Sequence, residues 1–372
     1  SIWITPLILI SLGQSQILPY IYGLSNNNFR FIILSYEKTY HDKKDFIRLR
    51  NELESKNIKW IRLPFKKGYH HFISRVIFGI IAIKYTIYKY KINLVHLRGG
   101  YPALLYLATL SRKNYIYDIR AFWGQWADGG RTNQGSFLDN FLQYIDRYMI
   151  NNSSGNVVLD NSAYDYLKAN YNTNAPTEVI PTSTDINRFK SSEERKDKAI
   201  KFVCLGGGRY PYLIKEAMLF VLNLINLDIN CSIDFINKGD HHEIEKAQIE
   251  TKFPKKYMSI FSFSRAEVSE KLAGYDCGLM FLADGKWIRM SSPTKLGEYL
   301  AAGLFVIGLE GNAALERIAK ESNCVHILKR YPKNLTYTKE QFKSLSKRIL
   351  DKKNKLSARK LAQRHYSIEV AI

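Results

Sequence analysis

The chain has 372 residues, of which 46% are hydrophobic, and this length and composition predict two domains with a core each. The formal net charge of +21 at pH 7 indicates a polyanionic neighbour: nucleic acid, an anionic membrane surface or a phosphorylated ligand. No stretch approaches the roughly 18 apolar residues of a membrane span, because the best candidate, residues 76–83, is followed directly by Lys84. We therefore expect a soluble chain.

In the first half of the chain, apolar segments typical of strands alternate with helical stretches, which predicts a parallel, doubly wound sheet. The predicted strands cover residues 1–5, 29–37, 59–64, 93–99, 114–120, 155–160 and 177–182. The first of them lacks the basic region and the small-residue cleavage site of a signal peptide, so we interpret it as a strand. The expected location is the cytoplasm.

Polar residues and glycines that could form a site follow the first and fourth predicted strands. Gly13 lies in a turn before a helix expected to begin near residue 15, where backbone N–H groups would face an anion. His96 and Arg98 end the fourth strand, next to two glycines that permit a tight turn. The alternative for His96 is a histidine whose hydrogen bonds are satisfied at a strand end.

The segment DIRAFWGQWADGG brings Asp118, Arg120 and Trp123 together in a long, glycine-containing loop after the fifth strand. Structural alternatives are an ion pair between Asp118 and Arg120 and a core position for Trp123. The shared position of these residues at strand ends favours a functional site, because ligands bind at the carboxyl ends of parallel strands.

Residues 66–92 interleave Lys and Arg with Tyr, Phe and Ile at a spacing compatible with a helix. Such a helix can lie in the headgroup layer of an anionic membrane, which would place the protein at the inner face of the cell membrane. The alternative is a helix that packs on the core and has a basic outer face.

A second alternation of strands and helices follows the polar stretch 191–199, which is the natural linker. Its predicted strands cover residues 200–206, 231–237, 258–264, 277–283, 304–309 and 324–328. The predicted domains are residues 1–190 and 191–345, followed by a helix over 346–372 that crosses back to the first domain. The predicted fold class is α/β, with two Rossmann-like doubly wound domains facing across a cleft.

The stretch SSPTKLGEYLAAGLFVIGLEG, residues 291–311, predicts a helix that begins after Ser292 as N-cap and ends before a left-handed Gly303. Lys295 falls in its first turn, where the helix dipole disfavours a positive charge unless an anion binds there. The alternative is a solvated pair between Lys295 and Glu298, which adds about 0.2 to 0.5 kcal/mol. The position of Lys295 suggests a phosphate.

Several segments resemble GT-B glycosyltransferases, and most of all the retaining family 4 enzymes that build bacterial cell-surface polysaccharides. The most specific resemblance is SPTKLGEYLAAGLFVIG, residues 292–308. The other matching segments are SLGQSQILPYIYGLS (11–25), DIRAFWGQWADGGR (118–131), VIPTSTDINRF (179–189), LGGGRYPYLIKEAM (205–218) and YSIEVAI (366–372). The resemblance therefore spans most of the chain.

This resemblance implies that the second domain binds a nucleoside-diphosphate sugar, with Glu298 on the ribose hydroxyls and Lys295 on the diphosphate. Catalysis would rest on orientation and on electrostatic stabilisation of the leaving diphosphate, and the implied catalytic residues are Asp118, Arg120 and Lys295. The implied donor-binding residues are Gly13, Gln14, Gly207, Arg209, Arg265, Ser292, Thr294, Lys295 and Glu298. The implied acceptor-binding residues are His96, Arg98 and Trp123.

Two departures from the family pattern concern the donor site. Met290 stands eight residues before Glu298, where the family has a further carboxylate that contacts the transferred sugar, and Asp284 is a candidate substitute. The usual Arg and Lys pair after the first strand of the donor domain appears only as Arg209, which leaves more of the phosphate to Lys295.

The predicted function is a glycosyltransferase, without metal or cofactor, that uses a nucleotide-sugar and a lipid-linked or oligosaccharide acceptor. A sugar-nucleotide epimerase on the same fold and a catalytically degenerate partner subunit are the alternatives. We expect no nucleic acid as partner, because the chain has neither a recognised reader motif nor base-stacking aromatics. A metal site is not expected either, since His241 and His242 have no second ligand cluster at metal spacing.

Overall fold

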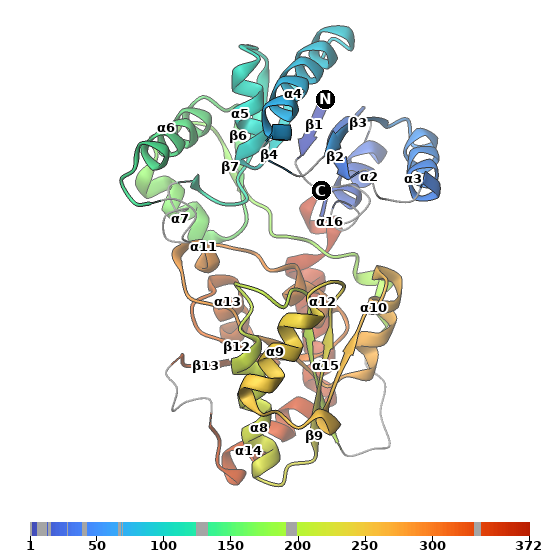
Figure 1. Cartoon of the computed structure of the whole chain (residues 1–372), viewed down its shortest axis with the longest axis vertical. Coiled ribbons are helices and arrows are strands. Elements are labelled where there is room, and N and C mark those ends of the chain that lie inside the picture. The colour runs from blue at the N-terminus through green and yellow to red at the C-terminus, as the bar shows by residue number, and fades with distance from the viewer. Residues whose placement is uncertain are drawn as a thin grey trace. The chain divides into compact units, whose positions relative to one another are not determined.

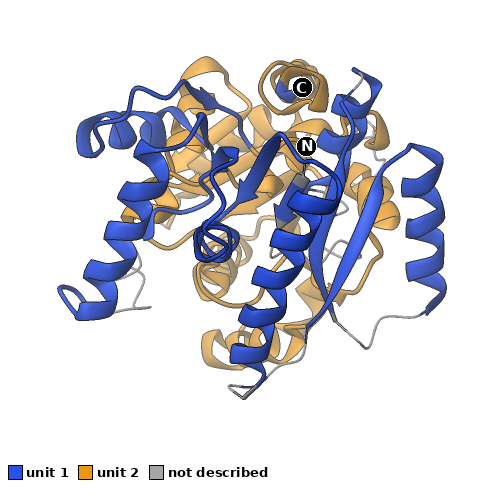
Figure 2. Cartoon of the chain, turned by 90° about the horizontal axis from the view of Figure 1, so that it is seen from above, with its two compact units in different colours: residues 1–181, 371–372 blue, residues 182–370 orange. Residues whose placement is uncertain are grey.

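The computed structural model describes residues 2–5, 13, 16–27, 29–38, 43–65, 68, 70–123, 133–190, 199–330 and 336–372. The chain forms two compact units, Ser1–Pro181 with Ala371–Ile372, and Thr182–Val370, which are coloured separately in Figure 2. The boundary after Pro181 precedes the expected boundary at residue 190. The reason is that Ile186 and Phe189 pack in the core of the second unit.

The first unit contains a parallel sheet of seven strands in the order β3-β2-β1-β4-β5-β6-β7. The strands are β1 (Ile2–Thr5), β2 (Ile32–Lys38), β3 (Lys59–Phe65), β4 (Leu94–Arg98), β5 (Asn114–Asp118), β6 (Gly155–Val158) and β7 (Thr177–Val179). The chain reverses its direction of winding between β3 and β4, on the two sides of β1. The doubly wound sheet predicted from the sequence is confirmed in this unit.

Helices connect the strands of the first unit (Figure 1). They are α2 (Leu18–Asn26), α3 (Lys43–Ser55), α4 (His70–Lys89), α5 (Gly100–Ala108), α6 (Phe137–Asn151) and α7 (Asn161–Asn170). One core cluster joins Trp3 and Ile33 of the sheet to Ile21 of α2 and to Leu49 and Leu53 of α3. Apolar side chains on strands and helices therefore meet on the face that α2 and α3 cover.

The second unit contains a parallel sheet of six strands in the order β10-β9-β8-β11-β12-β13. The strands are β8 (Ile200–Leu205), β9 (Cys231–Ile236), β10 (Met258–Phe261), β11 (Cys277–Met280), β12 (Phe305–Leu309) and β13 (Val325–Leu328). Each of the thirteen strands predicted from the sequence overlaps one of the strands of the two sheets.

Two buried clusters, one on each face of this second sheet, form the core of the second unit. The helices that supply them are α8 (Ile214–Asn226), α9 (His241–Thr251), α12 (Thr294–Ala301), α13 (Ala313–Glu321), α14 (Lys339–Leu350) and α15 (Lys352–Tyr366). Shorter helices are η3 (Ile186–Arg188), η4 (Lys255–Tyr257), α10 (Arg265–Lys271), η5 (Leu272–Gly274) and α11 (Lys286–Arg289). This unit is doubly wound as well.

The end of the chain is divided between the two units. Helix α15 packs on α12 in the second unit, and Tyr366 is fully buried there. The last helix, α16 (Ile368–Ala371), follows, and Ala371 packs against the first-unit core that contains Trp3. Ile372 lies against Gly23 of α2, where a larger side chain would collide with it.

Within the described ranges, one helix is long and apolar enough to cross a membrane by length and composition, over His71–Lys89 of α4. The expectation that no segment is apolar enough to span a membrane is therefore wrong, because Arg75 and Lys84 are the only charged residues in this window before Lys89 at its end. Only 22% of the window is buried. Its exposed apolar side chains are Phe72, Ile73, Ile77, Phe78, Ile81, Tyr85 and Tyr88.

Candidate active site

In the first unit, three basic side chains converge on the carboxylate of Asp118. The parallel register of β4 and β5 places Arg98 beside Asp118, and the guanidinium NH1 of Arg98 donates to Asp118 Oδ2 at 2.8 Å. Arg120 NH2 donates to the same oxygen at 2.6 Å, and His96 Nε2 lies 3.3 Å from it. The structure therefore brings together four residues that the sequence analysis singled out separately. We call them the Asp118 cluster.

The Asp118 cluster carries a net positive charge. Burial alone would raise the pKa of the Asp118 carboxyl, but Arg120 and Arg98 hold it well below its usual range, so the carboxylate stays ionised. Burial lowers the pKa of His96, so its ring is neutral at pH 7. This ring stacks on the ring of Trp3, with 3.6 Å between the ring centroids. Two guanidinium groups then face one carboxylate.

Trp123 is buried and packs on Gly100, where any added side chain would collide with its indole. Its position matches the core alternative, so it presents little surface to an acceptor. The backbone N–H of Trp123 donates to Asp146 Oδ2 of α6 at 3.0 Å, and Tyr117 donates its hydroxyl to Asp146 Oδ1 at 2.9 Å. Asp146 anchors the segment after β5, and no motif in the sequence identified it.

The first-strand loop is described only in part. The Gly13 carbonyl accepts a hydrogen bond from the Ile17 backbone N–H at 2.9 Å, and Gly13 is buried. Gln14 lies outside the described residues, so its predicted contact with the donor stays a prediction. Gln16 Oε1 lies 3.5 Å from Arg98 NH2, which extends the Asp118 cluster to the residues before α2.

In the second unit, Lys295 lies in the first turn of α12, at the carboxyl-terminal side of the sheet, as the sequence predicted. Its Nζ atom is shielded from solvent and has no hydrogen-bond partner among the described residues. The ammonium lies 3.0 Å from the centroid of the Tyr212 ring. The Lys295 side chain also passes so close to Gly206 that any side chain at position 206 would collide with it. Burial lowers the pKa of Lys295 to about 7, although Glu298 opposes the shift.

Glu298 follows Lys295 by one helical turn and shares its environment. Burial raises the pKa of the Glu298 carboxyl to about 7, against the opposing effect of Arg265, Lys295 and Arg188. The solvated pair considered above is therefore wrong, because the Lys295 ammonium is shielded from solvent and has no hydrogen-bond partner among the described residues. Arg188 of η3 was missed as a site residue, although it lies within the VIPTSTDINRF segment that the sequence analysis recognised.

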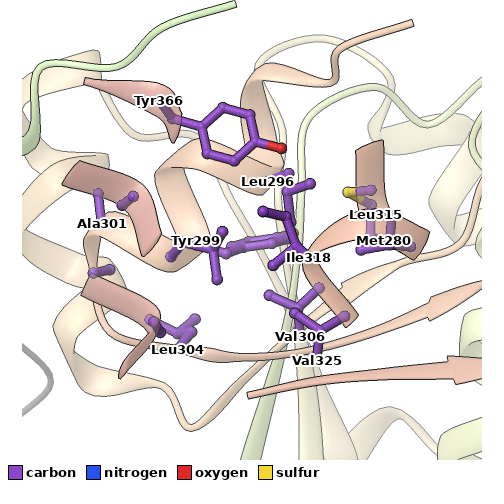
Figure 3. Packing of buried hydrophobic residues seen from close by; sticks show 14 of the residues in the cluster. Met280, Leu296, Tyr299, Ala301, Leu304, Val306, Leu315, Ile318, Val325 and Tyr366 are labelled. Atoms are coloured by element: carbon purple, nitrogen blue, oxygen red, sulfur yellow. The ribbon is translucent and has the colours of Figure 1, made fainter. Parts of the chain in front are cut away.

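The inward face of α12 fixes where Lys295 and Glu298 point. Figure 3 shows Leu296 and Tyr299 directed into the core, near Tyr366 of α15 and Ile318 of α13. The Tyr299 hydroxyl accepts a hydrogen bond from the Leu205 backbone N–H at 2.7 Å, which ties the helix to the end of β8. Lys295 and Glu298 lie at the edge of this apolar face, because each directly precedes one of its residues along the helix.

Pro293, and not Ser292, is the N-cap of α12, and no side chain caps this helix. The expected Ser292 cap is wrong because its hydroxyl accepts a hydrogen bond from the Thr182 backbone N–H at 3.0 Å instead. Ser292 is buried, whereas Thr294 is partly exposed in the first turn. Gly303 follows the helix with φ of 74°, as predicted.

The glycine-rich turn after β8 brings Gly207 near Lys295 but turns Arg209 toward two carboxylates. Gly207, Tyr212 and Lys295 line one small cavity. Arg209 Nε lies 3.3 Å from Asp240 Oδ1 and 3.2 Å from Glu243 Oε1, and its side chain is 70% exposed. Neighbouring carboxylates thus already neutralise Arg209, which weakens its predicted role at a phosphate.

Met290, the C-cap residue of α11, is buried, and its apolar side chain offers no polar group in place of the family's further carboxylate. Asp284, the candidate substitute, has a carboxylate that is 77% exposed. One of its oxygens accepts from the Gly285 backbone N–H at 2.9 Å and lies 3.9 Å from Arg330 Nε. Arg330 itself donates to the carbonyls of Leu282 and Ala283, which fixes the loop that carries Asp284.

Among the residues that the structure describes, no group of three or more His, Cys, Asp or Glu side chains could hold a metal ion. His241 Nε2 instead lies 2.8 Å from the Asn237 carbonyl oxygen and 3.0 Å from Ser262 Oγ. The expectation of a metal-independent site stays a prediction.

No family model and no curated protein matches the chain by sequence. Solved structures match it over its whole length, among them a sucrose-phosphate synthase from Thermosynechococcus elongatus (10% identity, TM-score 0.75, 95% of that chain covered). HepE from Anabaena, in complex with UDP and glucose, matches at 11% identity and a TM-score of 0.67, over 96% of its chain. A glycosyltransferase from Rickettsia africae matches at 13% identity and a TM-score of 0.67, over 94% of its chain.

The chain has the GT-B fold. The same fold is found in a UDP-N-acetylglucosamine 2-epimerase from Listeria monocytogenes, which matches at 12% identity with a TM-score of 0.61 over 92% of its chain. Likeness at such low identity establishes the architecture and leaves the reaction to be argued from the residues. In this GT-B chain those residues are the Asp118 cluster of the first unit and the Lys295 and Glu298 pair of the second.

Proposed function

We propose that the chain is a glycosyltransferase that transfers a sugar from a nucleoside-diphosphate sugar to a saccharide acceptor. The observation that carries the proposal is the Lys295 ammonium, which is shielded from solvent in the first turn of α12 without a hydrogen-bond partner among the described residues. A desolvated ammonium at a helix N-terminus lacks an anion, and a diphosphate supplies one. Glu298, one turn further on, would accept hydrogen bonds from the ribose hydroxyls.

The chemistry of the proposed transfer needs no protein nucleophile. Lys295 would neutralise charge on the departing diphosphate, and the Asp118 cluster would orient the sugar and the acceptor. Transfer with retention of configuration is part of the proposal, as is a site that works without metal. HepE, which has the same fold, was crystallised with UDP-glucose, and this supports a nucleotide-sugar as substrate.

The direct test is transfer from UDP-, GDP-, dTDP- and CMP-sugars to an oligosaccharide mixture, after a thermal-shift panel has identified the donor. A ligand that binds only the folded chain raises its apparent stability, so one nucleotide-sugar should stand out. A new glycosidic bond that forms only when both donor and acceptor are present supports the proposal. Conversion of the nucleotide-sugar without an acceptor would contradict it.

An epimerase is the second candidate, because the Listeria epimerase has the same fold. It would convert or hydrolyse the nucleotide-sugar without an acceptor, so the same product analysis separates the two. A degenerate partner subunit is the third candidate, since the buried Met290 replaces a carboxylate. Such a subunit would bind a nucleotide-sugar weakly or not at all and would form no product.

We also propose that the acceptor is lipid-linked, in the synthesis of a bacterial surface polysaccharide, and that α4 holds the chain at the cytoplasmic face of the membrane. The support is the row of exposed apolar side chains on α4, together with Arg75, Lys84, Lys89 and Lys91. Burial of such side chains in the headgroup layer would be favourable, and the basic groups would face anionic lipids.

Vesicle sedimentation tests this association with the full chain. Vesicles that contain anionic lipid should bind it, and Phe78→Glu should reduce the bound fraction severalfold, because a carboxylate would replace an exposed phenyl ring. Ile47→Glu is the matched control, since Ile47 is 59% exposed on α3, close to the 60% of Phe78. Equal losses in the two variants, or equal binding to neutral vesicles, would contradict the role of α4.

A further inference from the structure

The Asp118 cluster has more unpartnered donors than acceptors. Arg98 Nε, Arg120 Nε and Arg120 NH1 are shielded from solvent and have no hydrogen-bond partner among the described residues. Only one acceptor in the cluster, Asp118 Oδ1, is in the same condition. Shielded donors without partners are costly, so this imbalance indicates a missing acceptor group.

The charges of the cluster have the same imbalance. The Arg98 side chain is 2% exposed and that of Asp118 is 1% exposed, while Arg120 is partly exposed at 21%. One carboxylate thus compensates two guanidinium groups, and the neutral His96 adds no charge. Water solvates the remaining positive charge poorly at this depth, and an anion would compensate it.

The backbone beside the cluster leaves room for such an anion. Gly99 follows Arg98 with φ of 84°, its N–H donates to the Asp118 carbonyl at 2.8 Å, and a Cβ atom built on it would meet nothing within 4 Å. Gly99 is also the N-cap of α5, and no side chain caps this helix. The first N–H groups of α5 and its positive dipole end therefore lie next to Arg98.

We propose that the Asp118 cluster and the N-terminus of α5 bind a phosphate or diphosphate group in the first unit. Phosphate oxygens can engage two guanidinium groups and helix N–H groups at the same time, whereas a single carboxylate offers fewer acceptors in fewer directions. This site is separate from the Lys295 site of the second unit. Its assignment to a donor or an acceptor rests on the proposed function, but anion binding itself does not.

Isothermal titration of inorganic pyrophosphate into the full Lys295→Ala chain tests the site, because this substitution removes the phosphate contact of the second unit. We expect binding that weakens about tenfold when Arg120→Gln is added, the usual effect of losing a charge-assisted contact. Arg112→Gln is the matched control, since Arg112 is exposed and precedes β5 at the end remote from Asp118. Raised salt should weaken the binding as well.

Three outcomes would overturn the proposal: no pyrophosphate binding to the Lys295→Ala chain, equal affinity in the Arg120→Gln and Arg112→Gln variants, or acetate binding as tightly as pyrophosphate. If Arg120→Gln unfolds the chain, Arg120→Lys takes its place. It keeps the positive charge beside Asp118 but loses the planar fork, so pyrophosphate affinity should still fall severalfold. Unchanged affinity in a folded Arg120→Lys chain would also contradict the site.

Transfer kinetics then identify which substrate carries the phosphate. If the acceptor carries it, Arg120→Gln raises the KM of a saccharide 1-phosphate acceptor and leaves that of the free saccharide unchanged. If the donor carries it, the KM of the nucleotide-sugar rises with both acceptors. Absence of any transfer would reject the proposed function while the pyrophosphate titration would still decide the anion site.

Discussion

In the first unit the Asp118 carboxylate receives three basic side chains on one oxygen, whereas in the second unit the Lys295 ammonium has no hydrogen-bond partner among the described residues. The pKa of Asp118 is accordingly held below its usual range. Those of Lys295 and Glu298 are both displaced to about 7, each toward its neutral form. One group is ionised because its partners are in place, and the other pair is poised between charge states.

The difference shows that a buried charge can either stabilise the fold or form part of a ligand-binding site. Partners supplied by the fold keep Asp118 ionised and make this carboxylate part of the stability of the first unit, because its removal leaves Arg98 and Arg120 uncompensated, while their surplus positive charge is still free to bind an anion. Partners supplied by a ligand make Lys295 and Glu298 a binding site, because the cost of their burial is recovered only when the ligand is present. The predictions below address this difference.

The largest expected effect is on the stability of the first unit. Asp118→Asn removes the counter-charge of Arg98 and Arg120, and should lower the free energy of unfolding by about 3 to 5 kcal/mol. Urea denaturation followed by tryptophan fluorescence measures it, and the exposed Asp165→Asn of α7 should change it by about 0.5 kcal/mol or less.

The corresponding change in the second unit, Lys295→Met, should cost about 1 kcal/mol or less, since it removes a desolvated ammonium that contacts the Tyr212 ring but has no hydrogen-bond partner among the described residues. Comparable losses for Asp118→Asn and Lys295→Met would show that the two sites do not differ as described. The Asp118 contribution also has a defined pH dependence. Because the pKa is lowered in the folded chain, this stability is present above the ordinary pKa of Asp and is lost as the pH falls.

The next largest effect is expected on the catalytic efficiency of sugar transfer. Lys295→Ala and Glu298→Ala should each lower kcat/KM by about 10² to 10³, the usual loss when a group that stabilises the leaving charge or orients the substrate is removed. Lys320→Ala of α13 and Glu245→Ala of α9 remove the same charges at exposed positions of the second unit. Activity within a few-fold of wild type in either site variant would reject the site assignment.

A smaller effect is expected in the pH dependence of nucleoside-diphosphate binding. A diphosphate favours the charged Lys295, so affinity should fall as the pH rises above about 7, and ribose hydroxyls favour the ionised Glu298, so affinity should fall below about 7. Titration calorimetry at several pH values should give a maximum near neutrality. Glu298→Gln should remove the decrease in affinity at acidic pH. An affinity that does not change with pH on either side of neutrality would contradict the displaced pKa values of Lys295 and Glu298.

The smallest expected effect concerns Arg209. Because Asp240 and Glu243 already neutralise it at an exposed position, Arg209→Ala should change the KM of the donor by less than about threefold. Steady-state kinetics with the identified donor measure this. A loss of tenfold or more would show that Arg209 leaves its two carboxylates to contact the ligand.

The sequence predicted the strands well because each is a short apolar segment bounded by turn residues, and it predicted the left-handed Gly303 for a similar local reason. It was less accurate where a residue has a partner far along the chain. Ser292 has the properties of a helix cap, yet its hydroxyl bonds to Thr182, a residue 110 positions away. Arg209 has the properties of a phosphate ligand, yet it forms an ion pair with the carboxylate of Glu243 on α9.

The candidate site residues also divide into those that local sequence features identify and those that such features do not identify. Lys295 and Glu298 were identified because their spacing on one helix and the surrounding motif are local features of the sequence. Asp146 and Arg188 were missed, since α6 gives no sign that Asp146 meets Trp123, and a single arginine in η3 gives no sign that it acts on Glu298. These contacts depend on side chains that only folding brings together.

By itself the sequence determined the two α/β units, the position of each parallel strand and the helix that carries Lys295 and Glu298, because hydrophobic periodicity and turn chemistry act over a few residues. Only the tertiary structure decided which charges are paired. It placed Arg98, Arg120 and His96 on one oxygen of Asp118 and left Lys295 over the ring of Tyr212. Ionisation depends on burial and on neighbours in space, and strand register and helix packing alone set both.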